Sequence, residues 1–137
     1  MANYTFETVA VGANLFNGYN VGIGTPDTLQ LKLYTNDVTV TSATVVGDLT
    51  ECVDGGYSAY ALTPGSWTVT WSIDRSIATF TVDNTITFAG TTSIYGAYIT
   101  NAAGTILIGV ADFGTVKTYD AADELVFTEG SFGIKPV

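Results

Sequence analysis

Acidic side chains are the residues whose type and spacing could do chemistry in this sequence, and they gather in two places. Asp48, Glu51 and Asp54 follow one another at three-residue spacing. The second group lies near the C-terminal strands and comprises Asp112, Asp120, Asp123 and Glu124. Grouped carboxylates can bind calcium or act as the paired acids of glycoside hydrolysis. Neither group has the D-x-D-x-D-G spacing of a calcium loop, and 137 residues leave little chain for a substrate cleft. Solvated loop acids are therefore the favoured interpretation.

Aromatic side chains offer a second kind of site, a platform on which sugars could stack. The candidates are Tyr57, Tyr60, Trp67, Trp71, Tyr95 and Tyr98. Trp67 and Trp71 share one face of an alternating segment with Val69 and Ile73, which favours a place in the core. Tyr95 and Tyr98 are predicted on opposite faces of one strand, so that at least one reaches a surface or an interface.

Nucleophiles and metal ligands are scarce. The sequence has no histidine and one cysteine, Cys52, which excludes a Ser-His-Asp triad, a Cys-His pair, histidine-bound zinc and an internal disulfide. Cys52 follows Glu51 and has no cationic neighbour in sequence, so a small buried hydrophobe is expected rather than a reactive thiolate. We expect no catalytic residue, no cofactor and no metal.

The net charge of the chain limits the kinds of molecule that it can bind. Thirteen acidic and four basic residues give a formal charge of −9, which repels the phosphates of nucleic acids. The basic residues, Lys32, Arg75, Lys117 and Lys135, are too dispersed to form a nucleic-acid patch. No segment approaches the ~18 consecutive apolar residues of a membrane helix. We therefore expect neither nucleic acid nor membrane as a partner.

The elements that would position these residues are β-strands. Thr occurs 23 times and Val 14 times, and Gly supplies 15 further residues suited to turns. Leu29, Leu31 and Leu33 alternate with Gln30, Lys32 and Tyr34, and Ile86 and Phe88 alternate with Thr85 and Thr87. Such alternation predicts one dry and one polar face. Residues 93–100 and 105–113 are apolar on both faces, which is typical of central strands in a two-layer sandwich or of strands covered by a neighbouring subunit.

An all-β, single-domain antiparallel sandwich of about eight strands follows, with a jelly roll favoured over an immunoglobulin-like order. The strands are expected to start near Leu29, Tyr57, Trp67, Ile77, Thr85, Ser93, Thr105 and Glu124. Residues 83–84 predict a tight hairpin and residues 101–104 a slightly longer one. Residues 36–54 are expected to form a structured loop over the sheet.

The first 28 residues are predicted to be an N-terminal arm, and residues 29–137 the sandwich domain. The arm carries a possible strand at 4–11 and a Gly- and Asn-rich stretch without clear periodicity. Its apolar side chains need a surface to pack on. The predicted partner contacts are Tyr4, Phe6, Leu15, Phe16 and Tyr19 of the arm, with Tyr95 and Tyr98 of the domain.

The block at 29–62, LQLKLYTNDVTVTSATVVGDLTECVDGGYSAYAL, resembles small structural proteins of tailed bacteriophages. It combines an alternating strand, a Tyr-x-Asn, a Thr-rich loop, Leu-Thr-Glu, and a Gly-Tyr that opens the next strand. The resemblance extends to about Phe113 through the Trp67 strand, the strand at 85–88, residues 93–98 and the hairpin at 102–105. It implies a role in virion assembly, as a capsid decoration (cement) protein, a minor head protein or a piece of tail fibre.

We expect a cement protein that binds the outer surface of a phage head, contacts the major capsid protein and stabilises the shell as a homotrimer. The acidic surface suits the face turned away from DNA, and the arm could add a strand to a neighbour. The alternative is a tail-fibre or receptor-binding module that grips host carbohydrate. An enzyme is not expected, because His and Cys pairs are missing.

Overall fold

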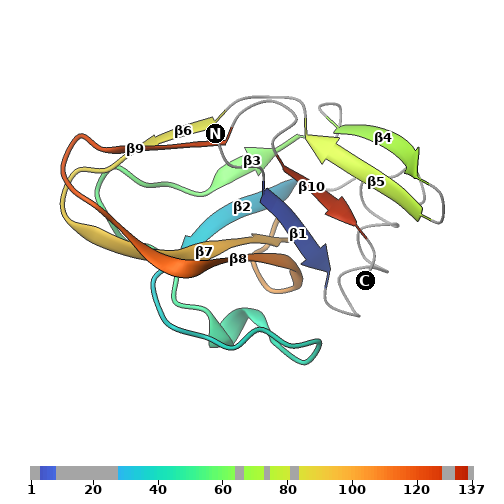
Figure 1. Cartoon of the computed structure of the whole chain (residues 1–137), viewed down its shortest axis with the longest axis horizontal. Coiled ribbons are helices and arrows are strands. Elements are labelled where there is room, and N and C mark those ends of the chain that lie inside the picture. Colours follow the sequence, from blue (N-terminus) through green and yellow to red (C-terminus); the bar gives the residue numbers. More distant parts are fainter. Residues whose placement is uncertain are drawn as a thin grey trace.

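The computed structural model describes residues 4–8, 28–63, 67–72, 75–80, 84–127 and 132–135, with side-chain surroundings for 28–63 and 84–127. These residues form ten strands and one short 3-10 turn (Figure 1). The strands are β1 (Tyr4–Thr8), β2 (Leu29–Tyr34), β3 (Tyr60–Leu62), β4 (Trp67–Ser72), β5 (Arg75–Phe80), β6 (Asn84–Thr87), β7 (Thr92–Thr100), β8 (Leu107–Tyr119), β9 (Glu124–Phe127) and β10 (Phe132–Lys135). The turn, η1, spans Val46–Asp48. The predicted β class is confirmed, since the described residues include no α-helix.

Hydrogen bonding arranges the strands in two sheets. The larger sheet has the order β3-β2-β7-β8-β1-β10-β5-β4, and the smaller pairs β6 with β9. The four strands β3, β2, β7 and β8 pair antiparallel, whereas β1 and β10 pair parallel. This order does not show a jelly roll, which has two four-stranded sheets.

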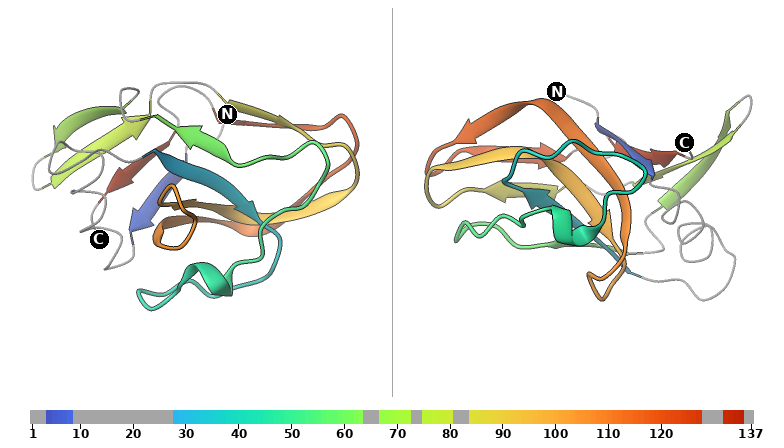
Figure 2. Two further views of the ribbon diagram at one scale, coloured as in Figure 1. Left: turned by 180° about the vertical axis from the view of Figure 1, so that it is seen from behind. Right: turned by 90° about the horizontal axis from the view of Figure 1, so that it is seen from below.

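One apolar core, here called the first core, lies between the two sheets. Leu29, Leu31 and Leu33 of β2 face it, as the alternation predicts, together with Ile86 of β6 and Phe127 of β9. In Figures 1 and 2, β6 and β9 lie over one side of β2, β7 and β8. The sheets therefore cover one another through side chains from both layers, which is the energetic reason for a sandwich.

Residues 35–50, the first part of the loop between β2 and β3, cover the opposite side of β2, β7 and β8 (Figures 1 and 2). Leu49 of this loop packs with Tyr34, Tyr98, Leu107 and Val110 in what we call the second core. Tyr34 was predicted on a polar face, and this is wrong: the loop covers that face and leaves Tyr34 1% exposed. The predicted structured loop is confirmed.

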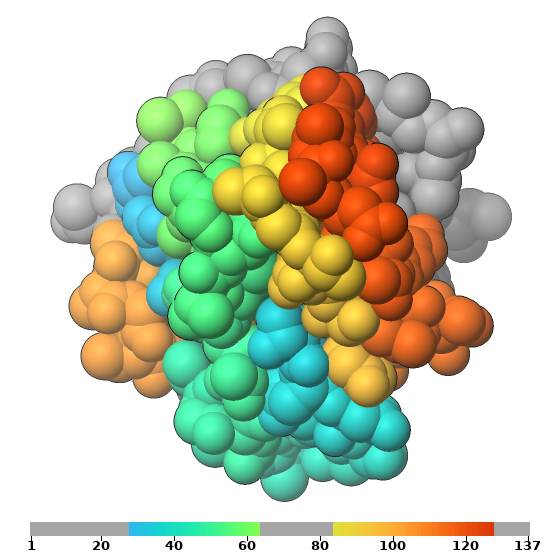
Figure 3. Space-filling model, turned by 90° about the vertical axis from the view of Figure 1, so that its left-hand side faces the viewer, coloured from blue at the N-terminus to red at the C-terminus, as the bar shows by residue number. Residues whose placement is uncertain are grey.

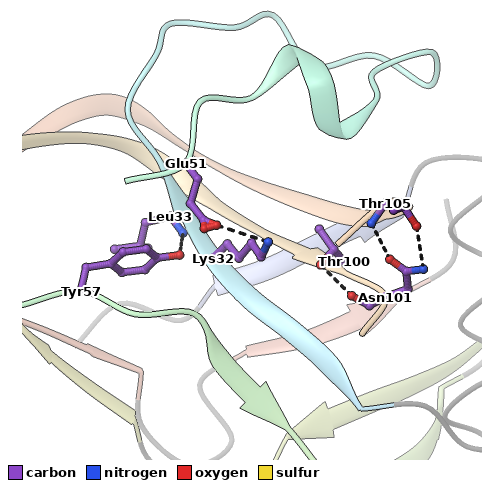
Figure 4. Close-up of polar contacts among 7 residues, drawn as sticks. All are labelled: Lys32, Leu33, Glu51, Tyr57, Thr100, Asn101 and Thr105. Carbon is purple, nitrogen blue, oxygen red and sulfur yellow. Dashed lines mark hydrogen bonds and ion pairs between the residues drawn. The ribbon is translucent and has the colours of Figure 1, made fainter. Parts of the chain in front are cut away.

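Backbone and side-chain hydrogen bonds hold the loop against β2. Thr35 N donates to Thr50 O at 2.9 Å, and Cys52 N donates to Leu33 O at 2.9 Å. Asn36 bridges the loop, because its Nδ2 donates to Asp48 O and its Oδ1 accepts from Thr50 N. Lys32 and Glu51 add an ion pair at 3.3 Å (Figure 4). The loop is thus fixed at several points along its length.

The strands start within three residues of the eight predicted positions. β8 continues to Tyr119, past the expected end at Phe113, and β10 was not predicted. The hairpin at 101–104 is confirmed between β7 and β8, where Asn101 Oδ1 accepts from Thr105 N (Figure 4). The same oxygen also accepts from Ile106 N. The tight hairpin at 83–84 is wrong: β6 pairs with β9, and β5 pairs with β4 and β10.

The pairing of β7 with β8 is irregular where the predicted faces of two tyrosines change. The register with β8 shifts between Ile94 and Gly96. Ile94 and Ala97 both face the first core, while Tyr95 and Tyr98 both contact the second. The strand β8 runs from Asp112 to Lys117 while β7 covers only Ile94 to Gly96, so the extra residues lie in β8. The alternation of β7 breaks at the same place. Tyr95 and Tyr98 therefore lie on the same side, contrary to the prediction from uninterrupted alternation.

The predicted strand in the N-terminal segment is confirmed at Tyr4–Thr8. It pairs with β8 and β10 of this same chain, so these five residues belong to the large sheet rather than to a separate arm. Leu15, Phe16 and Tyr19 lie outside the described residues, and the arm remains a prediction for that stretch. No helix in the described ranges has the length and apolar character needed to cross a bilayer.

Candidate functional site

The three acids of the first predicted group, Asp48, Glu51 and Asp54, each have a different structural partner. Asp48 Oδ2 accepts from Val45 N at 3.0 Å, and Glu51 pairs with Lys32. Asp54 accepts hydrogen bonds from the backbone N–H groups of Gly56, Ala89 and Gly90, and so ties the loop to the end of β6. Those bonds, led by the one from Ala89, lower the pKa of the Asp54 carboxyl.

Substituting Asp54 by alanine should lower the midpoint of thermal unfolding by a few degrees at pH 7. The folded state lowers the pKa of Asp54, so the stabilisation is present above the unfolded pKa and is lost as pH falls through the folded pKa. The difference between wild type and Asp54→Ala should therefore shrink on acidification below pH 4. Calorimetry over a pH series measures it. Glu124→Gln is the control, and a pH-independent difference would contradict the carboxylate's role.

The second acidic group also forms turns. Asp120 Oδ1 accepts from the Thr91 hydroxyl at 2.9 Å, and Asp123 Oδ2 accepts from Asp120 N at 2.8 Å. Asp112 Oδ1 accepts from Gly114 N at 2.7 Å. Across the described residues, no group of three or more acidic, Cys or His side chains could hold a metal ion. Asp120 and Asp123 are loop carboxylates, as expected, whereas Asp112 lies in β8 and Glu124 in β9.

The predicted aromatic platform is not assembled from the described side chains. Tyr57 and Tyr60 pack against the first core, and the Tyr57 hydroxyl accepts from Leu33 N at 3.3 Å (Figure 4). Tyr95 and Tyr98 lie at the second core, on the other side of the sheet. The side chains of Trp67 and Trp71 lie outside the description. Cys52 is buried in the first core, where burial raises the pKa of its thiol, as expected for a structural cysteine.

A hollow of about 330 Å³ opens between the loop and β8. It is lined by Tyr34, Asp37, Val38, Tyr95, Asp112 and residues 114–116, and we call it the Asp37–Asp112 hollow. Asp37 and Val38 also line two adjoining depressions along the loop. Figure 3 shows the loop as the lower part of one face of the molecule, below β6 and β9.

Strand register explains how the hollow is built. Tyr34 of β2 pairs with Gly96 of β7, and Gly96 pairs with Asp112 of β8, so the three form one row across the sheet. Gly96 has no side chain, and a Cβ there would lie 2.6 Å from the Tyr34 hydroxyl. The Tyr34 side chain therefore passes over Gly96, along the row that ends at Asp112.

The Tyr34 hydroxyl has no hydrogen-bond partner although the side chain is 1% exposed. Burial raises the pKa of this phenol, and the negative charges of Asp112 and Asp37 raise it further. The hydroxyl is thus neutral, and it lies close enough to both carboxylates to interact with them electrostatically. A buried polar group without a partner calls for a bound water, ion or ligand group.

Sequence reasoning identified Asp112 but grouped it with the wrong neighbours, and it did not select Tyr34 or Asp37. Of the predicted partner contacts, Tyr95 lines the hollow, whereas Tyr98 is 2% exposed and offers almost no surface. The loop covers Tyr98 within this chain, and the partner contacts stay predictions. Tyr4 and Phe6 lie in β1, where side-chain surroundings are not described.

No protein-family model matches the chain, and neither a curated protein nor a solved structure matches it.

Proposed function

We propose that this chain is a capsid decoration protein that binds the outer surface of a phage head and stabilises the shell by contact with the major capsid protein. The supporting observation is the block at 29–62, whose sequence resembles phage structural proteins. Within this block β2 and β3 pair, and backbone hydrogen bonds hold the loop between them against β2. A loop fixed in this way presents a stable surface, which is what rigid protein–protein contact requires.

Surface charge supports the same role. Residues 28–63 and 84–127 contain eight acidic residues and only two basic ones, Lys32 and Lys117. Most of these acids are exposed, which suits a face turned away from packaged DNA. We further propose that the chain acts as a homotrimer, by binding rather than by catalysis, and that the complete sandwich is jelly-roll-like with an arm that reaches a neighbour.

Purified protein added to phage heads that lack it tests this role. We expect the chain to sediment with the heads up to a saturating ratio and to raise the temperature at which they release DNA, because many equivalent contacts resist internal pressure together. Heads that already carry the protein are the control and should take up little more. Failure to bind, or unchanged heat resistance, contradicts the proposal. Binding to host polysaccharide on a glycan array instead would favour the tail-fibre alternative.

A further inference from the structure

We propose that the Asp37–Asp112 hollow is a seat for the guanidinium group of an arginine side chain on the partner protein. This deepens the proposed function and rests on it for the nature of the partner. The inference starts from the Tyr34 hydroxyl, a buried polar group without a partner at the wall of a hollow that also holds two carboxylates. Such a group is normally paired in a complete assembly.

The polar groups of the hollow favour a cation that carries several hydrogen-bond donors. Asp37 and Asp112 are exposed carboxylates that accept hydrogen bonds, and the Tyr34 oxygen can accept one while its proton turns toward a carboxylate. Guanidinium carries five N–H donors in a planar fork and no acceptor, so it can serve several such oxygens at once. An ammonium group acts as a point charge and meets fewer of them.

The apolar lining fits the rest of an arginine side chain. Val38 and Tyr95 are half-buried against the second core, and Val116 on β8 is 42% exposed. The methylene stem of arginine packs on such surfaces while its head stays at the polar end. Calcium is a poorer fit, because it takes about six to eight oxygen ligands and the hollow supplies two carboxylates.

Long-range charge favours the same occupant. The chain carries a formal charge of −9, and the described acids include Asp48 on the depression that adjoins Asp37. A negative surface attracts a basic group from solution and orients it before contact. Arginine is also over-represented among the residues that dominate binding at protein interfaces.

The test uses the folded chain alone, labelled with nitrogen-15, and the probe N-acetyl-arginine amide. We expect amide shifts at Gly96, Asp112 and Gly114 with millimolar affinity. The neutral analogue N-acetyl-citrulline amide has nearly the same shape and should bind at least about tenfold more weakly. Calcium chloride and a neutral disaccharide are the competing probes. If either shifts these amides and the arginine probe does not, the inference is overturned.

Three variants sharpen the result. Tyr34→Phe keeps the ring and removes the hydroxyl, and should weaken the arginine probe by about three- to tenfold. Asp112→Asn keeps an oxygen for Gly114 N and removes the charge, and should weaken it by about tenfold or more. Glu124→Gln removes a charge outside the hollow and should leave binding unchanged. Equal effects from Asp112→Asn and Glu124→Gln would overturn a specific seat.

Binding to heads separates this inference from the proposed function. If the arginine probe binds and the wild-type chain does not attach to heads, the decoration role fails and the guanidinium site stands. If the chain attaches to heads and Tyr34→Phe and Asp112→Asn attach as well as wild type, the hollow is not where the partner docks and the inference is overturned. Loss of attachment in both variants, with Glu124→Gln unaffected, supports the two together.

Discussion

Gly96→Ala is expected to destabilise the protein by about 3 kcal/mol, among the largest effects of any single methyl group in this chain. A Cβ at this position would collide with the backbone carbonyl of Ala111 on the neighbouring strand, which cannot move without breaking the β7–β8 pairing. It would also lie 2.7 Å from Cε1 of Tyr34. The Tyr34 ring would have to leave the row that it shares with Gly96 and Asp112.

Gly47→Ala is the matched control, because a Cβ there meets nothing within 4 Å. We expect its stability to be unchanged or raised by up to about 1 kcal/mol, through the lower entropy of the unfolded chain. Urea unfolding of the two variants and wild type measures both effects. Similar stabilities for Gly96→Ala and Gly47→Ala would contradict the close approach of Tyr34 and β8 over Gly96.

Phe88→Ala is expected to cost about 3–5 kcal/mol. Phe88 is 1% exposed in the first core and stacks on Tyr119 with ring centroids 4.5 Å apart. Its backbone also bonds Asp123 and Ala122, so this residue joins the end of β6 to the turn before β9. Removal of the ring leaves a cavity between the small sheet and the large one.

The control for Phe88→Ala is Val53→Ala, since Val53 is an apolar side chain that is 94% exposed. Its stability should change by no more than about 0.5 kcal/mol. Chemical unfolding of both variants gives the comparison. A small loss for Phe88→Ala, equal to that for Val53→Ala, would mean that β6 and β9 do not cover the first core as described.

Local alternation predicted the side of the sheet that packs on the first core. The leucines of β2 and the Ile86 and Phe88 positions could be read because period two reports which side of a strand is dry. Tyr34 could not be placed in the same way. It is buried by a loop whose packing depends on the second core, which gathers residues far apart in sequence such as Leu49 and Tyr98.

Strand pairing and the candidate site could not be predicted from the sequence either, because both depend on contacts between residues far apart in the chain. β6 finds its partner in β9, about forty residues later, while the sequence offers a nearer neighbour in β5. The row Tyr34, Gly96, Asp112 exists only through the register of three strands, which includes an irregular stretch of β8. Asp112 could be named as a candidate, but its companions could not.

The number of copies in each purified virion tests the central claim most directly, and quantitative mass spectrometry against the major capsid protein measures it. A decoration protein that coats the head should be present in hundreds of copies, in fixed proportion to the shell. A few dozen copies or fewer would place the chain in the tail, and its absence from the particle would contradict a structural role altogether.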